Sequence, residues 1–188
     1  MHPSRPSEGP TATAASEPAP LRWRPRNRLW ALLALGTVGS VAFTAISTWR
    51  DEHLFLVNAS KSLPNWAFLI HRQQVPQRGD YVFFDPPASD LLRRHFGPEP
   101  QMFGKIIYGL PGDRVAHAGS LVLINGAAIS RMKPRTRAGE PLTPGAVGAV
   151  PPGCYYAGTR HPDGFDSRYA EIGFVCRRQI VGVGEPVL

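Results

Sequence analysis

The stretch from Leu29 to Trp49 contains no charged residue and is rich in leucine, alanine and valine. A helix needs about 20 predominantly apolar residues to cross the hydrocarbon core of a bilayer. Trp30 and Trp49 lie near the two ends of the stretch, where indole rings favour the membrane interface. The sequence therefore predicts a transmembrane helix over residues 29–49, with the lipid bilayer as a partner of the chain.

The charges that flank this segment predict its orientation. Arginine recurs through residues 22–28, whereas residues 50–52 hold one arginine and two acidic residues. Because positive charge stays on the cytoplasmic side, we expect a cytoplasmic N-terminus and an exported body. Residues 1–28 are then a cytoplasmic tail, which we expect to be disordered where Pro, Ala, Ser and Thr dominate. Residues 29–49 are predicted to be a signal anchor in the inner membrane. Residues 50–188 are predicted to be a periplasmic domain. A cleaved signal peptide is the alternative, with Ala45-Ile46-Ser47 as a candidate cleavage site.

The part of the chain after the anchor has the pattern of a β-rich domain. The 20 prolines and 19 glycines of the chain favour a loop-rich body over a helical bundle. Short apolar or β-branched runs separated by turn residues predict an antiparallel, mainly β fold with one short capped helix over residues 89–97. The predicted strands are Leu54–Val57, Trp66–His71, Tyr81–Phe84, Met102–Tyr108, Ser120–Ile124, Ala127–Ser130, Cys154–Gly158 and Phe174–Val183.

Composition and spacing exclude several function classes. The net charge of +7 is spread along the chain without a dense basic and aromatic patch, so no nucleic-acid partner is expected. The two cysteines, Cys154 and Cys176, match no metal-ligand spacing, and we expect neither a metal nor a cofactor. In an exported domain these cysteines are candidates for a disulfide, and two buried free thiols are the alternative.

Ser62 and Lys105 are the candidates for catalysis. A serine is a poor nucleophile at neutral pH and needs a neighbouring base. A lysine serves as that base when burial lowers its pKa, and Lys105 lies in an apolar run. The alternatives are a serine that only bonds to backbone in a turn and an edge-strand lysine that prevents aggregation. A Ser-His-Asp triad is disfavoured, because no Gly-x-Ser-x-Gly motif is present and no histidine, His161 included, is placed near Ser62 by sequence.

Four segments resemble the signal peptidase I superfamily, in that family's order. Residues 58–64 (NASKSLP) resemble its nucleophile box, and residues 78–84 (RGDYVFF) resemble the strand that follows. Residues 105–113 (KIIYGLPGD) are similar to its lysine box, and residues 163–169 (DGFDSRY) to its last box. The resemblance implies a signal-peptidase-like antiparallel β body and a serine endopeptidase that removes a leader or propeptide from an exported precursor.

Within that superfamily the chain is most similar to the TraF group of conjugative-transfer peptidases. The Ser-Leu-Pro form of the nucleophile box, the preceding Asn58, and Asp85-Pro86-Pro87 after the second strand carry this likeness. The chain has no room for the large extra β domain of longer housekeeping enzymes. It also has Gly164 where those enzymes have a serine near the base, so another group must orient Lys105.

The resemblance assigns a role to each site residue. Ser62 is the nucleophile and Lys105 the general base, while the Ser62 backbone N–H and the Ser60 hydroxyl stabilise the oxyanion. Asp166 and Arg168 form an ion pair that holds the last box near the dyad. In TraF-like enzymes the aspartate of this box is associated with activity, so Asp166 is a candidate catalytic residue as well as a structural one.

The expected function is therefore maturation of an exported precursor, by resemblance a pilin precursor of a conjugation or type IV secretion system, with cyclisation of the product left open. One alternative is a housekeeping type I signal peptidase of broad specificity. Another is a catalytically silent, membrane-anchored assembly protein on the same fold. A self-cleaving repressor is disfavoured, because the chain has a membrane segment and lacks a helix-turn-helix motif.

Overall fold

The computed structural model describes residues 25–58 and 63–187, and the chain divides after Ala45 into two units. Helix α1 spans Pro25–Glu52 and begins with proline, which suits the first helical position. Its segment Asn27–Glu52 is long and apolar enough to cross a membrane. The apolar side chains along it are exposed, with Leu35 at 70% and Phe43 at 74%. Exposed apolar side chains along a whole helix are typical of a lipid-facing segment.

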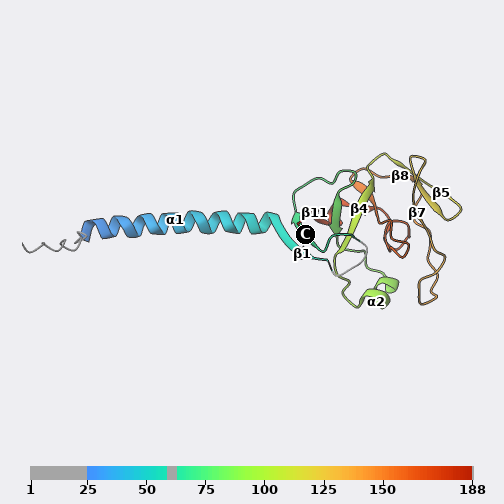
Figure 1. Cartoon of the computed structure of the whole chain (residues 1–188), viewed down its shortest axis with the longest axis horizontal. Coiled ribbons are helices and arrows are strands. Elements are labelled where there is room, and N and C mark those ends of the chain that lie inside the picture. The colour runs from blue at the N-terminus through green and yellow to red at the C-terminus, as the bar shows by residue number, and fades with distance from the viewer. Residues whose placement is uncertain (1–24, 59–62, 188) are drawn as a thin grey trace, which may run out of the picture. The chain divides into compact units, whose positions relative to one another are not determined.

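Residues 53–187 form an antiparallel β domain, which confirms the predicted fold class (Figure 1). The larger sheet has the strand order β1-β2-β11-β3-β4-β9-β10. Its strands are β1 (His53–Val57), β2 (Ala67–His71), β3 (Tyr81–Phe84), β4 (Phe103–Gly109), β9 (Cys154–Gly158), β10 (Val175–Cys176) and β11 (Ile180–Pro186). The last long strand, β11, pairs with β2 on one side and with β3 on the other.

A smaller sheet has the order β7-β6-β5-β8. Its strands are β5 (Arg114–Ala118), β6 (Leu121–Ile124), β7 (Ala127–Arg131) and β8 (Gly148–Ala149). The predicted hairpin is confirmed, because β6 and β7 pair across Asn125 and Gly126, whose φ angles are 51° and 85°. Two successive positive φ angles fit the Asn-Gly turn that joins twisted strands tightly. The small strand β5 was not predicted from the sequence.

The short helix α2 (Asp90–Phe96) confirms the prediction for residues 89–97. The Ser89 side chain accepts a hydrogen bond from the Leu92 N–H, and Gly97 ends the helix with φ of 95°. Leu91 and Leu92 are buried, and Leu92 packs with Val82 of β3 in one core cluster. The helix is thereby fixed against the larger sheet. A three-residue 3₁₀ turn, η1 (Arg177–Gln179), divides the stretch predicted as one strand over 174–183 into β10 and β11.

The core comprises three apolar clusters. One lies under α2, a second joins the two sheets around Tyr156 and Val122, and a third lies beside β2 and contains Leu63 and Phe68. Phe68 is fully buried in this third cluster, whereas Trp66 is 56% exposed. Each large apolar side chain that is fully buried contributes about 1.5–3 kcal/mol to the free energy of unfolding.

Candidate active site

Lys105 lies in the first half of β4, opposite Val82 of β3. Only 6% of its surface is exposed. Its Nζ lies 5.4 Å from the centroid of the Phe103 ring and, among the described residues, forms no hydrogen bond or ion pair. Burial lowers the pKa of Lys105, the nearby Asp166 opposes that shift and Arg168 adds to it. The surroundings therefore favour a neutral amine, the form that can accept a proton.

The strand edge beside Lys105 is open on one side. Strand β9 pairs with only part of β4. The pairing begins where Gly158 lies opposite Ile106 and continues along the second half of β4. The Ile107 N–H and C=O both bond to the turn that precedes β3. The N–H and C=O groups of successive residues in a strand point alternately to its two sides. Those of Gly104 therefore point away from β3, to the side of β9, at a position beyond the end of β9. Gly104 therefore presents its N–H and C=O at an edge that no described strand covers.

Ser60 and Ser62 lie outside the described residues, and the structure fixes instead the residue that follows them. Leu63 is 5% exposed and packs with Phe83 in the third core cluster. A Cβ atom built on Gly104 would lie only 2.9 Å from Leu63 Cδ1, so a side chain at 104 is excluded. The residue after Ser62 therefore lies against the residue before Lys105, although some forty residues separate them in the chain.

Asp166 and Arg168 form a buried ion pair in the loop after β9. The distance from Arg168 Nε to Asp166 Oδ1 is 2.8 Å, and that from Nη2 to Oδ2 is 2.9 Å. The backbone N–H groups of Thr159 and Arg168 also donate to the Asp166 carboxylate. Complete burial raises the pKa of Asp166, while the Arg168 charge and these hydrogen bonds oppose the rise. A guanidinium is always charged, so the two-bonded pair holds Asp166 as a carboxylate.

Arg168 also ties this loop to the smaller sheet. Its Nη1 donates to the carbonyl oxygens of Arg131, at the end of β7, and His161. Its Nη2 donates to the carbonyl of Thr159. Since every donor direction of the guanidinium has an acceptor, the ion pair predicted from sequence is present and holds three segments together.

The absence of a side chain at Gly164 has a steric reason. A Cβ atom at 164 would overlap Thr159 Cγ2 and lie 3.0 Å from both Arg168 Nη2 and Asp166 Oδ2. A serine therefore does not fit this loop as it is packed. The space that would hold a hydroxyl is filled by Thr159 and by the buried ion pair.

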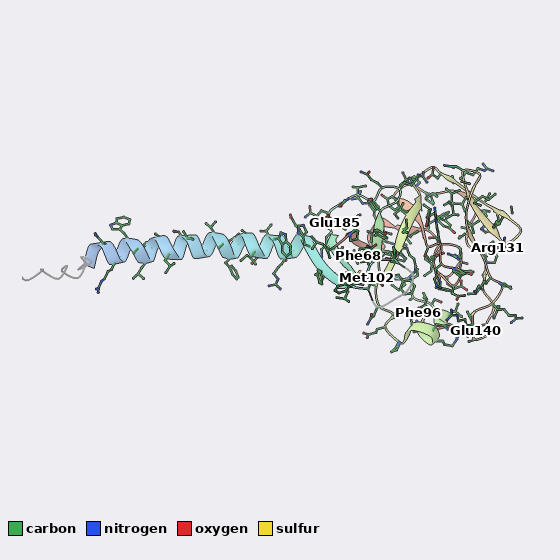
Figure 2. The ribbon with its side chains drawn as sticks, viewed as in Figure 1. Phe68, Phe96, Met102, Arg131, Glu140 and Glu185 are labelled. Atoms are coloured by element: carbon green, nitrogen blue, oxygen red, sulfur yellow. A yellow bond between two sulfur atoms is a disulfide. The ribbon has the colours of Figure 1, made fainter. Side chains whose placement is uncertain are left out.

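A cavity of about 1490 Å³ runs along these groups. Lys105, Gly104 and Gly164 line it, together with Val57 and Asn58, which precede the undescribed serines. Its remaining walls come from α2, the segment after α2 and the loop after β7. In Figure 2, Phe96 of α2 and Glu140 of that loop lie beside each other on this side of the domain. The cavity is large enough for an extended peptide segment.

Three of the described histidines, at positions 71, 95 and 161, form hydrogen bonds with carboxylate or backbone groups. His161 lines the cavity, and its Nδ1 accepts a hydrogen bond from the Asp163 N–H. His95 pairs with Glu140, and His71 with Glu185. Among the described residues no cluster of histidine, cysteine and acidic side chains is placed to hold a metal ion.

Comparison with known proteins places this arrangement in a family. Residues 28–188 match the model of the signal peptidase family, peptidase S26. The chain belongs to this family. Its members are serine peptidases that remove leader peptides, so this S26 chain is a serine peptidase of exported precursors with an N-terminal apolar helix suited to anchor it in a membrane.

Individual relatives add little to the family assignment. No curated protein matches the chain. Among solved structures, a signal peptidase I from Enterococcus faecalis is 24% identical, with a TM-score of 0.36, over 58% of this chain and 97% of that one.

In this S26 domain Cys154 and Cys176 form a disulfide. The two residues are register partners in β9 and β10, with a sequence separation of 22. Strand β9 leads directly into Thr159 and the Asp166 loop. The disulfide therefore ties down the strand that supports the ion pair, and closing a loop of this length stabilises a domain by about 3 kcal/mol.

Proposed function

We propose that the chain is a membrane-anchored endopeptidase with a Ser62–Lys105 dyad that removes a leader or propeptide from an exported precursor. The observation that carries the proposal is the contact of Leu63 with Gly104 beside a buried lysine. This contact sets Leu63, the residue that follows Ser62 in the sequence, against the strand of Lys105 at the wall of a peptide-sized cavity.

The chemistry follows from these roles. The Ser62 hydroxyl attacks the scissile carbonyl carbon while neutral Lys105 accepts its proton. The Ser62 N–H, with the Ser60 hydroxyl, stabilises the oxyanion. The C–N bond then breaks, and the lysine ammonium returns the proton to the leaving amine. Water attacks the resulting ester, Lys105 accepts a proton from it, and Ser62 leaves with that proton as the free hydroxyl.

The substrate is proposed to bind as an extended strand. The backbone groups of Gly104 at the open edge of β4 are suited to pair with a peptide backbone. A Cβ atom at position 104 would press against the Leu63 and Phe83 side chains that form the floor beneath this part of β4. Because the peptide backbone would lie close to the strand, the residue just before the cut has space for a small side chain.

Cleavage of matched precursor peptides tests this function. With the full-length protein in detergent, we expect a peptide with alanine before the cut to be cleaved at least about tenfold faster than one with leucine or lysine, since a methylene in a tight pocket changes rates by about 10–200-fold. The product masses should give one cut site. Equal cleavage of all three peptides would contradict the pocket, and cleavage of none would contradict the proposed function.

The natural substrate is proposed to be a pilin precursor of a conjugation or type IV secretion system. The TraF-like nucleophile box supports this, as does the Asp166 loop, which is packed around a glycine at 164.

Cyclisation of the product is compatible with the mechanism, since an amine can resolve the acyl-enzyme in place of water. Incubation with the propilin of a conjugative system tests it, and mass spectrometry separates a linear from a cyclic product by one water. A broad-specificity housekeeping enzyme would cut unrelated secretory precursors equally well.

The membrane orientation is also a proposal. The arginines of residues 22–28 support a cytoplasmic N-terminus, with residues 29–49 in the inner membrane and residues 50–188 in the periplasm. Protease added to spheroplasts should therefore digest the body and spare an epitope tag at the N-terminus. A body protected from the protease until the membrane is dissolved would reverse the orientation.

A further inference from the structure

One part of the cavity wall is rich in basic side chains. Residues 133–137, in the loop after β7, contribute Lys133, Arg135 and Arg137 to the cavity lining. We call these three side chains the cationic wall. The carboxylates on the lining are Asp163, in the last box, and Asp85 and Glu99, which follow β3 and α2 respectively.

The loop that carries the cationic wall is a fixed structure. Backbone hydrogen bonds join Thr136 to Glu140 and Leu142 to Pro134, so the loop folds back on itself as a hairpin. At its base the Lys133 N–H donates to the Tyr169 hydroxyl at 3.0 Å. At its far end Glu140 binds Arg94 and His95 of α2. The wall is therefore held in place before a substrate arrives.

The positive charges of the wall are only partly neutralised. Lys133 and Arg137 share one carboxylate, that of Asp163, whose pKa their charges and hydrogen bonds lower to about 2. Glu140 is occupied by Arg94 and His95 of α2. Arg135 donates to the carbonyl of Gly139 at 2.7 Å and, among the described residues, pairs with no carboxylate. The cationic wall itself therefore carries more positive than negative charge, and part of the Arg135 guanidinium has no carboxylate partner among the described residues.

Resting on the proposed peptidase function, we propose that the cationic wall is a specificity subsite for an acidic residue of the precursor, with Arg135 as the residue that binds its carboxylate. An arginine fork binds a carboxylate through two parallel hydrogen bonds, which gives position as well as affinity. A peptide extended along β4 lies in the same cavity as the wall, so one of its side chains can reach Arg135 while its backbone pairs with Gly104. The subsite then selects precursors by charge at one distance from the cut.

The test is a peptide set with alanine before the cut, in which a single glutamate, glutamine or lysine occupies each neighbouring position in turn. The full-length protein in detergent should cut one glutamate peptide about three- to tenfold faster, in kcat/KM, than its glutamine counterpart, as expected for one partly exposed charge pair. Raising the salt concentration should reduce this ratio, because the pair is accessible to ions.

Variants assign the preference to Arg135. In Arg135→Gln the glutamate-to-glutamine ratio should fall to about one, and in Arg135→Glu the lysine peptide at that position should become the better substrate. Arg178→Gln, an exposed arginine outside the cavity lining, is the control and should keep the wild-type ratio. Cleavage without charge preference at any position, or a preference that survives in Arg135→Glu, would overturn the subsite and leave the peptidase function standing. Failure to cut any peptide would overturn both.

Discussion

Replacing Ser62 with alanine or Lys105 with methionine is expected to lower kcat/KM for precursor cleavage by about 10⁴-fold or more, because neither group of a nucleophile–base pair substitutes for the other. The double variant should be no slower than the single ones, since the two residues act as a unit. Lys105→Arg should be equally inactive, because a guanidinium stays charged and accepts no proton.

The Lys105→Met variant distinguishes loss of the catalytic base from loss of the folded structure. Methionine has a similar shape to lysine, and it removes an amine whose charge is disfavoured at a site only 6% exposed. We therefore expect this variant to unfold at the wild-type temperature or a few degrees above it while it cuts nothing. An inactive variant that unfolds well below the wild type would leave the role of Lys105 as a base without support, and an active one would contradict it.

The second large effect is expected at Asp166. Alanine at this position leaves the Arg168 guanidinium, which is 1% exposed, without its carboxylate. Breaking a buried ion pair from one side costs about 3–5 kcal/mol. For a domain of this size the melting temperature should fall by roughly 6–20 °C, at about 2–4 °C for each kcal/mol. Thermal unfolding followed by circular dichroism measures it.

Asp163→Ala is the matched control for this prediction. Asp163 lies in the same box and also pairs with cations, but its ion pairs are at the surface and the change in melting temperature should be much smaller. Equal melting of Asp166→Ala and the wild type would show that the buried pair is not the support proposed. Asp166→Asn adds a kinetic readout: loss of the charge that raises the pKa of Lys105 should move the onset of activity to lower pH.

The local elements could be predicted from the sequence because their signals are local. Asn125-Gly126 specified a hairpin, and Ser89 with Gly97 bounded α2. The insertion of β11 between β2 and β3 could not be predicted, since pairing over a hundred residues leaves no local pattern. The strand β5 was missed because its run RVAHA has only one large apolar residue, Val115.

Part of the candidate site could likewise be predicted from the sequence, and part could not. The sequence motifs identify Lys105, Asp166 and Arg168 as candidate site residues. In the structure Lys105 is buried, and Asp166 and Arg168 form a buried ion pair. The cationic wall could not be predicted from a sequence motif. Its three basic residues form one surface only because the loop folds back on itself and is bound to α2. Gly164 was read as the loss of a hydroxyl, whereas its packing shows that Thr159 and the ion pair fill the space.

The dependence of kcat/KM on pH tests the central claim, that neutral Lys105 is the base. Burial lowers the pKa of Lys105, so the neutral amine gains population as pH rises through that lowered pKa. The rate should therefore rise with pH through one ionisation below the pKa of a free lysine and level off above it. A rise centred near the ordinary histidine pKa, about 6.5, that disappears in His161→Gln would contradict the account and assign the base to histidine.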